Sequence, residues 1–325
     1  MYYRMTPKII CYLLSFISLL TLVVVPLIGS NNLGISEQIR WEILLHLRIP
    51  RVLFAYLVGF SLALIGTVYQ SLLRNDLATP YTLGVSSGGA LGAVLAMKLG
   101  INFSWAGYST VTFFSIGGSF ITIWMIYLMA HTPSGSSTVR LVLTGVTISL
   151  FFSSLILFIH YLADFTETYR MVRWLMGGLQ ISSWKYIWIL LPLTFFFFLY
   201  FLFHGHALNI MSAGFETAMS KGVDVARLQK QSFIYSSVLI GVVVAFAGPI
   251  GFVGLIIPHL MRLFIGADHR PLIPAACLTG GIFLVWCDTV ARTIIAPAEL
   301  PVGVITALIG TPFFIWILIR TQRVI

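Results

Sequence analysis

Charged side chains are scarce in this chain, and their scarcity excludes most classes of soluble protein. Only 9% of the 325 residues are Asp, Glu, Lys or Arg, whereas soluble globular proteins carry roughly 25%. A chain with so few charges cannot cover a water-facing surface with polar side chains. Its hydrophobic fraction of 58% also excludes intrinsic disorder, which requires low hydrophobicity and high charge. The composition therefore predicts a polytopic membrane protein.

Cysteine is also rare, which excludes a disulfide framework. The three cysteines, Cys11, Cys277 and Cys287, all lie in apolar stretches and form no close pair. The neighbouring histidines His204 and His206 have no carboxylate or cysteine at a spacing that would complete a metal site. We therefore expect no metal site in this chain, and we interpret the cysteines as small apolar core residues.

Three functional signatures are missing as well. The chain lacks a G-x-x-x-x-G-K-[ST] phosphate loop, so it does not bind ATP by that device. Ser86 and Ser87 precede two glycines, but there is no G-x-S-x-G elbow and no acid–base set, so we interpret this segment as close helix packing. The basic residues behind the net charge of +9 are scattered singly along hydrophobic sequence. The residues therefore favour neither an enzyme nor a nucleic-acid-binding protein.

Long charge-free stretches are what the sequence has in abundance. About 20 apolar residues cross a bilayer as a helix. The charge-free stretches are residues 9–36, 52–73, 77–97, 99–139, 141–163, 186–215, 231–261, 271–287 and 300–319. The stretch 231–261 is too long for one ordinary span and is interrupted by Gly248 and Pro249, so we divide it in two. This division predicts ten spans.

The distribution of basic residues tests this number. With ten spans and a cytoplasmic N-terminus, 11 of the 19 Lys and Arg residues lie inside and the other 8 outside. Nine spans with an outer N-terminus give the same ratio, so the positive-inside rule alone leaves both arrangements open. The apolar run after Arg4 and Lys8 is long enough to span and has no A-x-A-like site after it. We interpret it as a retained first span.

Three long blocks of the sequence carry a resemblance to a known family. The first is residues 47–92, the second is AFAGPIGFVGLIIPHLMRLFIGADHRPLIP at 245–274, and the third is DTVARTIIAPAELPVGVITALIGTPFFIWIL at 288–318. In unbroken order they resemble the iron-siderophore and cobalamin ABC importer permeases of the FecCD family. The resemblance implies an all-α polytopic membrane protein with the type II ABC importer permease fold. It also implies a single permease domain over residues 1–325, ten transmembrane helices and two cytoplasmic termini.

The resemblance further implies a transport subunit, not an enzyme. The chain would pair with a second permease subunit, identical or paralogous, and with two cytoplasmic ATPase subunits that use ATP, while binding no cofactor itself. A periplasmic or lipid-anchored substrate-binding protein would deliver the cargo to the bacterial cytoplasmic (inner) membrane. We expect a ferric siderophore as cargo, and cobalamin or haem is the open alternative. An ion-coupled secondary transporter is more distant, because it would need intramembrane charges beyond Asp288.

The predicted cytoplasmic segment 205–230 is the candidate coupling element for the ATPases. Short amphipathic helices turned at Gly222 would fit a groove on a partner, although the residues alone favour a solvated connecting loop. The similarity of residues 214–227 to the coupling region of the family favours the coupling role. The expected coupling residues are Glu216, Lys221, Gly222, Val223, Asp224 and Arg227.

Three arginines at predicted outer span ends are candidates for docking the binding protein. In the family, arginines that match Arg48, Arg51 and Arg292 pair with acidic residues on the two lobes of the binding protein. A guanidinium offers a planar fork to a carboxylate, and complementary charge fixes the register of docking. Snorkelling or a local ion pair remains the alternative. For Arg292 the local partner is Asp288, four residues earlier, at good spacing for a pair within one helix.

The resemblance also implies an inner gate. Ser137 and Thr138 lie where the family narrows its inner gate, an assignment that rests on alignment to Arg140. The residues that line the pore stay undefined, because the apolar spans give no clear polar stripe to follow.

Overall fold

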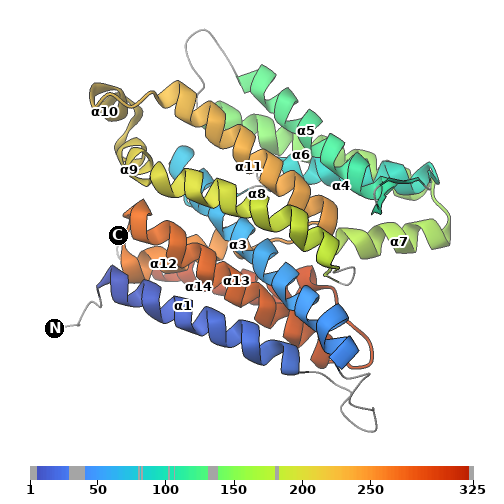
Figure 1. Ribbon diagram of the computed structural model, residues 1–325. Coiled ribbons are helices and arrows are strands. Elements are labelled where there is room, and N and C mark those ends of the chain that lie inside the picture. The colour runs from blue at the N-terminus through green and yellow to red at the C-terminus, as the bar shows by residue number, and fades with distance from the viewer. Residues whose placement is uncertain are drawn as a thin grey trace. The chain divides into compact units, whose positions relative to one another are not determined.

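The computed structural model describes residues 6–321, apart from 29–40, 80, 82, 102, 106, 131–137 and 180–182. Within this part the chain is built almost entirely of helices, and a short antiparallel hairpin joins α4 to α5 (Figure 1). The all-α prediction is confirmed. The elements are α1 (Pro7–Val24), η1 (Val25–Leu27), η2 (Leu44–Arg48), α3 (Ile49–Leu72), α4 (Val85–Lys98), β1 (Ser104–Trp105), β2 (Tyr108–Ser109), α5 (Thr110–Ala130), α6 (Thr138–Tyr161), α7 (Phe165–Leu175), α8 (Trp184–Phe203), α9 (Gly205–Ala213), α10 (Phe215–Ser220), α11 (Val225–Ala247), α12 (Val253–Ile265), α13 (His269–Thr293) and α14 (Val302–Thr321).

The helices group into two compact units, each assembled from segments far apart in the sequence. Unit 1 comprises Met1–Thr67, Gly177–Phe195 and Ile250–Ile325. Unit 2 comprises Val68–Met176 and Phe196–Pro249. Two of the passages between the units lie inside the continuous helices α3 and α8. The single permease domain over residues 1–325 stays a prediction.

Unit 1 is organised around α13, which packs against α1, α12 and α14 (Figure 1). Glycines allow the closest approaches in this unit. A Cβ atom at Gly59 of α3 would overlap the carbonyl oxygen of Gly280 in α13, and one at Gly66 would overlap that of Gly254 in α12. The backbones of these helices are therefore in direct contact, which requires residues without a side chain at the crossings.

Unit 2 is organised around α4, which packs against α5, α6, α7 and α11. A Cβ atom at Gly88 would lie 2.7 Å from the carbonyl oxygen of Gly118 in α5, and one at Gly92 would overlap the carbonyl of Phe114. Ser86, at the start of the same helix, is buried. The interpretation of this Ser/Gly segment as close helix packing is confirmed.

Within the part of the chain that the structure describes, six helices are long and apolar enough to cross a membrane. They are Pro7–Leu27, Trp41–Leu72, Arg140–Tyr161, Trp184–Phe203, Val225–Ala247 and His269–Thr293. Three shorter apolar helices are Thr110–Ile126, Val253–Ile265 and Val302–Trp316. The multi-pass prediction is confirmed, whereas the number ten stays a prediction. The predicted break in the stretch 231–261 is present, because α11 ends at Gly248, whose φ is +67°, and α12 begins at Val253.

The candidate spans differ in how much of their apolar surface the chain itself covers. In the span that contains α3, 78% of the apolar window is buried, whereas the windows of α1 and α6 are each only 22% buried. Exposed leucine and phenylalanine side chains along α6 are compatible with a lipid environment. α3 is thus the inner scaffold of the fold, and its N-terminal end carries the first candidate site.

Candidate functional site

Five charged residues gather at one end of unit 1, and we call them the arginine cluster. Arg48 ends the π-helical turn η2, and Arg51 lies in the first turn of α3. Asp288 and Arg292 stand one turn apart near the end of α13. Glu299 lies in the connection between α13 and α14. The structure therefore brings all three predicted docking arginines together, with two carboxylates between them.

Arg51 holds both carboxylates of the arginine cluster with its guanidinium fork. Its Nε and Nη2 atoms donate to Asp288, at 3.1 Å and 2.9 Å, and its Nη1 atom donates to both oxygens of Glu299, at 3.0 Å and 3.1 Å. The Asp288 side chain is 2% exposed and that of Glu299 is 36% exposed. Arg51 thus joins an inner carboxylate, which is shielded from water, to an outer carboxylate, which is not.

Arg292 shares the inner carboxylate. Its Nε atom lies 3.1 Å from Asp288 Oδ2, so the predicted ion pair within the helix is confirmed. This Nε atom makes no aligned hydrogen bond, and Nη2 donates to Thr289 Oγ1 at 3.4 Å. The charge of Asp288 is therefore balanced by two arginines at once. A carboxylate held in this way is suited to a structural role.

Arg48 is the remaining cation of the arginine cluster. It is half-buried, donates from Nη1 to the Pro26 carbonyl at 3.5 Å, and lies close enough to act electrostatically on Arg292. Three arginines against two carboxylates leave the arginine cluster with one net positive charge. Sequence reasoning missed Glu299, although it is the first acidic residue after Arg292 and precedes the next apolar stretch.

The candidate coupling segment lies in unit 2 and consists of two short helices and a turn. α9 and α10 meet at Gly214, whose φ is +144°, and α10 ends at Ser220, two residues before Gly222, whose φ is +77°. The Val223 N–H donates to the Ala218 carbonyl at 2.9 Å, which closes the turn. The sequence prediction of short helices turned at Gly222 is confirmed.

Most of the predicted coupling residues are exposed. Glu216, Lys221, Gly222, Asp224 and Arg227 lie on the surface, and Val223 is half-buried. The Asp224 carboxylate caps α11 by accepting a hydrogen bond from the backbone N–H of Arg227 at 3.0 Å. A compact, capped turn with outward charges can transmit a push from a bound partner to α11.

A recess opens beside this turn. Its volume is about 570 Å³, and it is lined by side chains of α8, α9 and α11 together with Gly222 and Val223. The Tyr200 hydroxyl donates to Gln231 Oε1 at 2.9 Å, and the ring of His204 stacks on that of Tyr200 with 4.2 Å between centroids. Since Asp224 and Arg227 also line the recess, a partner that binds the turn meets both charged and aromatic groups.

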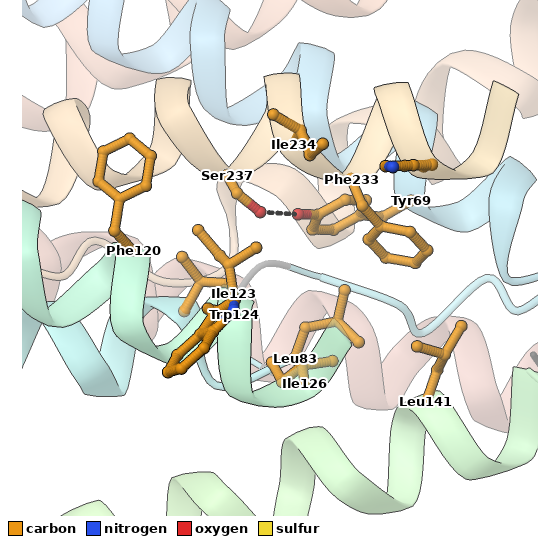
Figure 2. Close-up of a pocket in the computed structure, with 12 residues that line it drawn as sticks. Tyr69, Leu83, Phe120, Ile123, Trp124, Ile126, Leu141, Phe233, Ile234 and Ser237 are labelled. Carbon is orange, nitrogen blue, oxygen red and sulfur yellow. Dashed lines mark hydrogen bonds between the residues drawn. The ribbon is translucent and has the colours of Figure 1, made fainter. Parts of the chain in front are cut away.

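Unit 2 also contains an apolar pocket of about 210 Å³ (Figure 2). Phe120 and Trp124 of α5 face Ile234 and Ser237 of α11 across it, and Ser237 shares a hydrogen bond of 3.3 Å with the Tyr69 hydroxyl (Figure 2). Among its lining residues only Lys230 carries a charge. The pocket can accept an apolar group, but it has no pair of groups suited to acid–base chemistry.

The two residues predicted to form the inner gate are not fully described by the structure. Ser137 lies outside the described residues, and Thr138 is the first residue of α6, with its side chain outside the description. The inner gate therefore stays a prediction. Among residues 6–321, with the gaps given above, no group of three or more His, Cys, Asp or Glu side chains is placed to hold a metal ion.

Comparisons with known proteins identify the family to which the chain is similar. The model of the FecCD transport family matches residues 9–320. The chain is 36% identical over 319 residues to the hemin transport system permease protein HmuU of Yersinia pestis, which covers 94% of this chain and 95% of that one. It is 40% identical over 272 residues to the cobalamin import system permease protein BtuC of Halobacterium salinarum, and this match covers 84% of this chain and 72% of BtuC.

A solved structure agrees with these relatives. It is described as an inward-facing conformation of a putative metal-chelate type ABC transporter, and it matches with a TM-score of 0.87 at 33% identity. The match covers 97% of this chain and 99% of the other. The order of helices, their apolar character and the sequence similarity thus agree over nearly the full length. The chain belongs to the FecCD transport family and is a permease of an ABC importer.

Proposed function

We propose that this permease moves a ferric siderophore inward across the bacterial cytoplasmic membrane. The observation that carries the proposal is the family match over residues 9–320, together with a solved relative described as metal-chelate type. Hemin and cobalamin, named for two relatives, are also metal complexes held by large organic ligands. A cargo of this kind brings its own metal ligands, so the permease needs a path for a bulky chelate and no metal site.

The test of the cargo is uptake of radioactive iron by cells with and without this gene. The cells are offered a panel of ferric siderophores, with labelled haem and cobalamin in parallel. Loss of uptake for one siderophore supports the proposal and fixes the direction of transport. Normal uptake of every ferric siderophore by cells without the gene contradicts it.

Haem or cobalamin is the second candidate for the cargo. It is favoured by the transport of hemin and of cobalamin for which HmuU and BtuC are named, each at least 36% identical to this chain. The same uptake experiment separates the candidates. Loss of haem or cobalamin uptake with normal siderophore uptake would keep the importer and replace the cargo.

The proposed assembly contains a second permease subunit, identical or paralogous, two cytoplasmic ATPases and a periplasmic or lipid-anchored binding protein. The ATPases would contact the exposed turn around Gly222, and Glu216, Lys221, Val223, Asp224 and Arg227 would transmit the push. Exposure of this turn and its capping by Asp224 support the assignment. Purification of the tagged permease after mild crosslinking tests it, because cysteines placed in this turn should crosslink to the ATPase.

The binding protein would dock on the arginine cluster. Three arginines with one net positive charge suit an acidic partner surface, and Arg48 is the arginine for which no carboxylate contact is described. Both termini would lie in the cytoplasm, and Ser137 with Thr138 would form the inner gate. Labelling of single cysteines by an impermeant reagent in intact cells tests the topology, since residues near either terminus should stay unlabelled.

A further inference from the structure

Glu299 occupies one edge of the guanidinium that the proposed docking reaction needs. We propose that Glu299 is an internal competitor, which a carboxylate of the binding protein displaces from Arg51 when it docks. This inference rests on the proposed docking function of the arginine cluster. It assigns a role to a residue that the docking proposal itself does not include.

The two carboxylates on Arg51 are not equally exchangeable. Asp288 is 2% exposed, belongs to α13, and is also held by Arg292 at 3.1 Å. Releasing it would leave two arginines near the end of a helix bundle without their shared counter-ion. Glu299 is 36% exposed and lies in the connection after α13, where its carboxylate contacts Arg51 Nη1. Glu299 is therefore the carboxylate that an incoming acid can replace.

The exchange leaves the charge balance of Arg51 unchanged. Before docking, the guanidinium faces Asp288 and Glu299, and after docking it faces Asp288 and a partner carboxylate. One carboxylate contact through Nη1 is lost for each one gained, so the net gain from Arg51 is small. A small gain favours rapid release of the partner, because truncation or addition of such contacts acts mainly on the dissociation rate.

The connection that carries Glu299 is anchored to α13. The Leu300 N–H donates to the Ala291 carbonyl at 3.1 Å, and the Ala298 N–H donates to the Ile295 carbonyl at 2.9 Å. Glu299 can thus turn its side chain toward water while its backbone stays in place. The displacement requires rotation of one exposed side chain, not refolding of the connection.

The experiment measures association and dissociation of the binding protein on the complete importer in lipid nanodiscs. The probe is the substrate-binding protein whose addition stimulates ATP hydrolysis by the reconstituted complex. We expect Glu299→Gln to slow dissociation of the binding protein about fivefold, because the substitution removes the carboxylate that competes for Arg51. The expected change is a gain of affinity, which damage to the fold would not produce.

Two matched variants separate competition from other effects. Glu42→Gln removes another exposed acid on the same predicted outer side, from the segment that precedes Arg48, and it should leave dissociation unchanged. Arg51→Lys keeps the charge but loses the fork, so Glu299→Gln should have a smaller effect in that background. Equal effects of Glu42→Gln and Glu299→Gln would indicate bulk charge and overturn the proposal. Unchanged or faster dissociation of Glu299→Gln would also overturn it.

A fourth variant keeps the two proposals distinguishable. Arg48→Gln removes a docking arginine without touching Arg51 or either carboxylate. If Arg48→Gln weakens binding and Glu299→Gln changes nothing, docking stands and the competitor role fails. If neither variant changes binding, the docking site itself has been assigned wrongly, and the inference fails with it.

Discussion

The arginine cluster of unit 1 and the coupling segment of unit 2 differ in how far their charged side chains are buried. In the cluster, Arg51 and Arg292 are 14% and 12% exposed and share the buried Asp288. In the coupling segment, the charged ends of Glu216 and Lys221 are exposed. A charge near the end of an apolar span needs a counter-ion within the protein, whereas a charge on a water-facing turn does not.

This difference determines how substitutions should behave. Residues that share a counter-ion are energetically coupled, so the effects of their substitutions on stability do not add. Exposed charges contribute little to the free energy of unfolding, so their substitutions should become visible only when a partner binds.

The largest expected effect is on the stability of the cluster. Asp288→Ala leaves Arg51 and Arg292 without their shared buried carboxylate, and it should lower the free energy of unfolding by about 3–5 kcal/mol. Denaturant unfolding in detergent measures this loss. The double variant Asp288→Ala/Arg51→Met should recover part of it. Equal losses in the single and double variants would contradict the coupling.

A second prediction concerns docking at the cluster. Arg48→Glu should reduce import at least about tenfold, because it places a like charge against an acidic partner. Membrane insertion should stay normal, since Arg48 is half-buried and its described contact is a long one to a carbonyl. Uptake and membrane-fraction blots measure both. Arg51→Glu is a poorer test, because it would set a third carboxylate beside Asp288 and Glu299. Normal import by Arg48→Glu would exclude this surface.

In the coupling segment, substitutions should reduce import while leaving the free energy of unfolding almost unchanged. The double variant Lys221→Glu/Arg227→Glu should lower import about tenfold, because exposed charges that face a complementary partner are reversed. The free energy of unfolding of the permease alone should change by less than about 0.5 kcal/mol. Lys8→Glu, at another exposed cation, is the matched control. If the double variant loses stability but keeps normal import, the prediction for the coupling segment is wrong.

A side chain added at the turn of the coupling segment should reduce stability through backbone strain and not through steric overlap with neighbouring residues. Gly222 has a φ of +77°, and an added Cβ would meet nothing within 4 Å. Gly222→Ala should therefore cost about 1–2 kcal/mol from strain alone. Gly117→Ala, inside α5 and also in open space, should instead stabilise the protein by about 1 kcal/mol. Thermal unfolding of both variants tests this contrast.

The smallest effect concerns a half-buried ion pair elsewhere in unit 2. The Lys98 ammonium lies 2.7 Å from Glu167 Oε2, and with the Asp164 N–H it holds the pKa of the Glu167 carboxyl below its usual value of 4.5. Because the folded pKa is the lower one, this contribution to stability is complete above pH 4.5. It is lost as the pH falls from 4.5 through the folded pKa. Glu167→Gln should abolish this part of the acid dependence, and an unchanged unfolding profile below pH 4.5 would contradict it.

Local features of the fold were accessible from the sequence. The break after Ala247 follows from Gly248 and Pro249, and the pair Asp288–Arg292 follows from helical spacing. The turn predicted at Gly222 is present, and its positive φ is a conformation that glycine tolerates. Each of these depends on residues within one turn of helix or one short segment.

Features that join distant segments were not accessible. Arg51 and Asp288 are 237 residues apart, and no spacing rule connects them. The division into two units, each assembled from segments far apart in the sequence, depends on contacts that a single sequence does not show. Glu299 was therefore overlooked, since its role is visible only once Arg51 lies beside it.

The crossings of α3 in unit 1 have a mechanical consequence. At Gly59–Gly280 and Gly66–Gly254 the helix backbones approach closely, and the Cβ atoms of Ala63 and Leu284 border the first crossing. Such a contact fixes how far apart two helices stand, because a side chain at either glycine would push the two backbones apart. The two pairs of glycines therefore act as spacers of fixed width, and a larger residue at any of the four positions should widen the separation of the helices throughout unit 1.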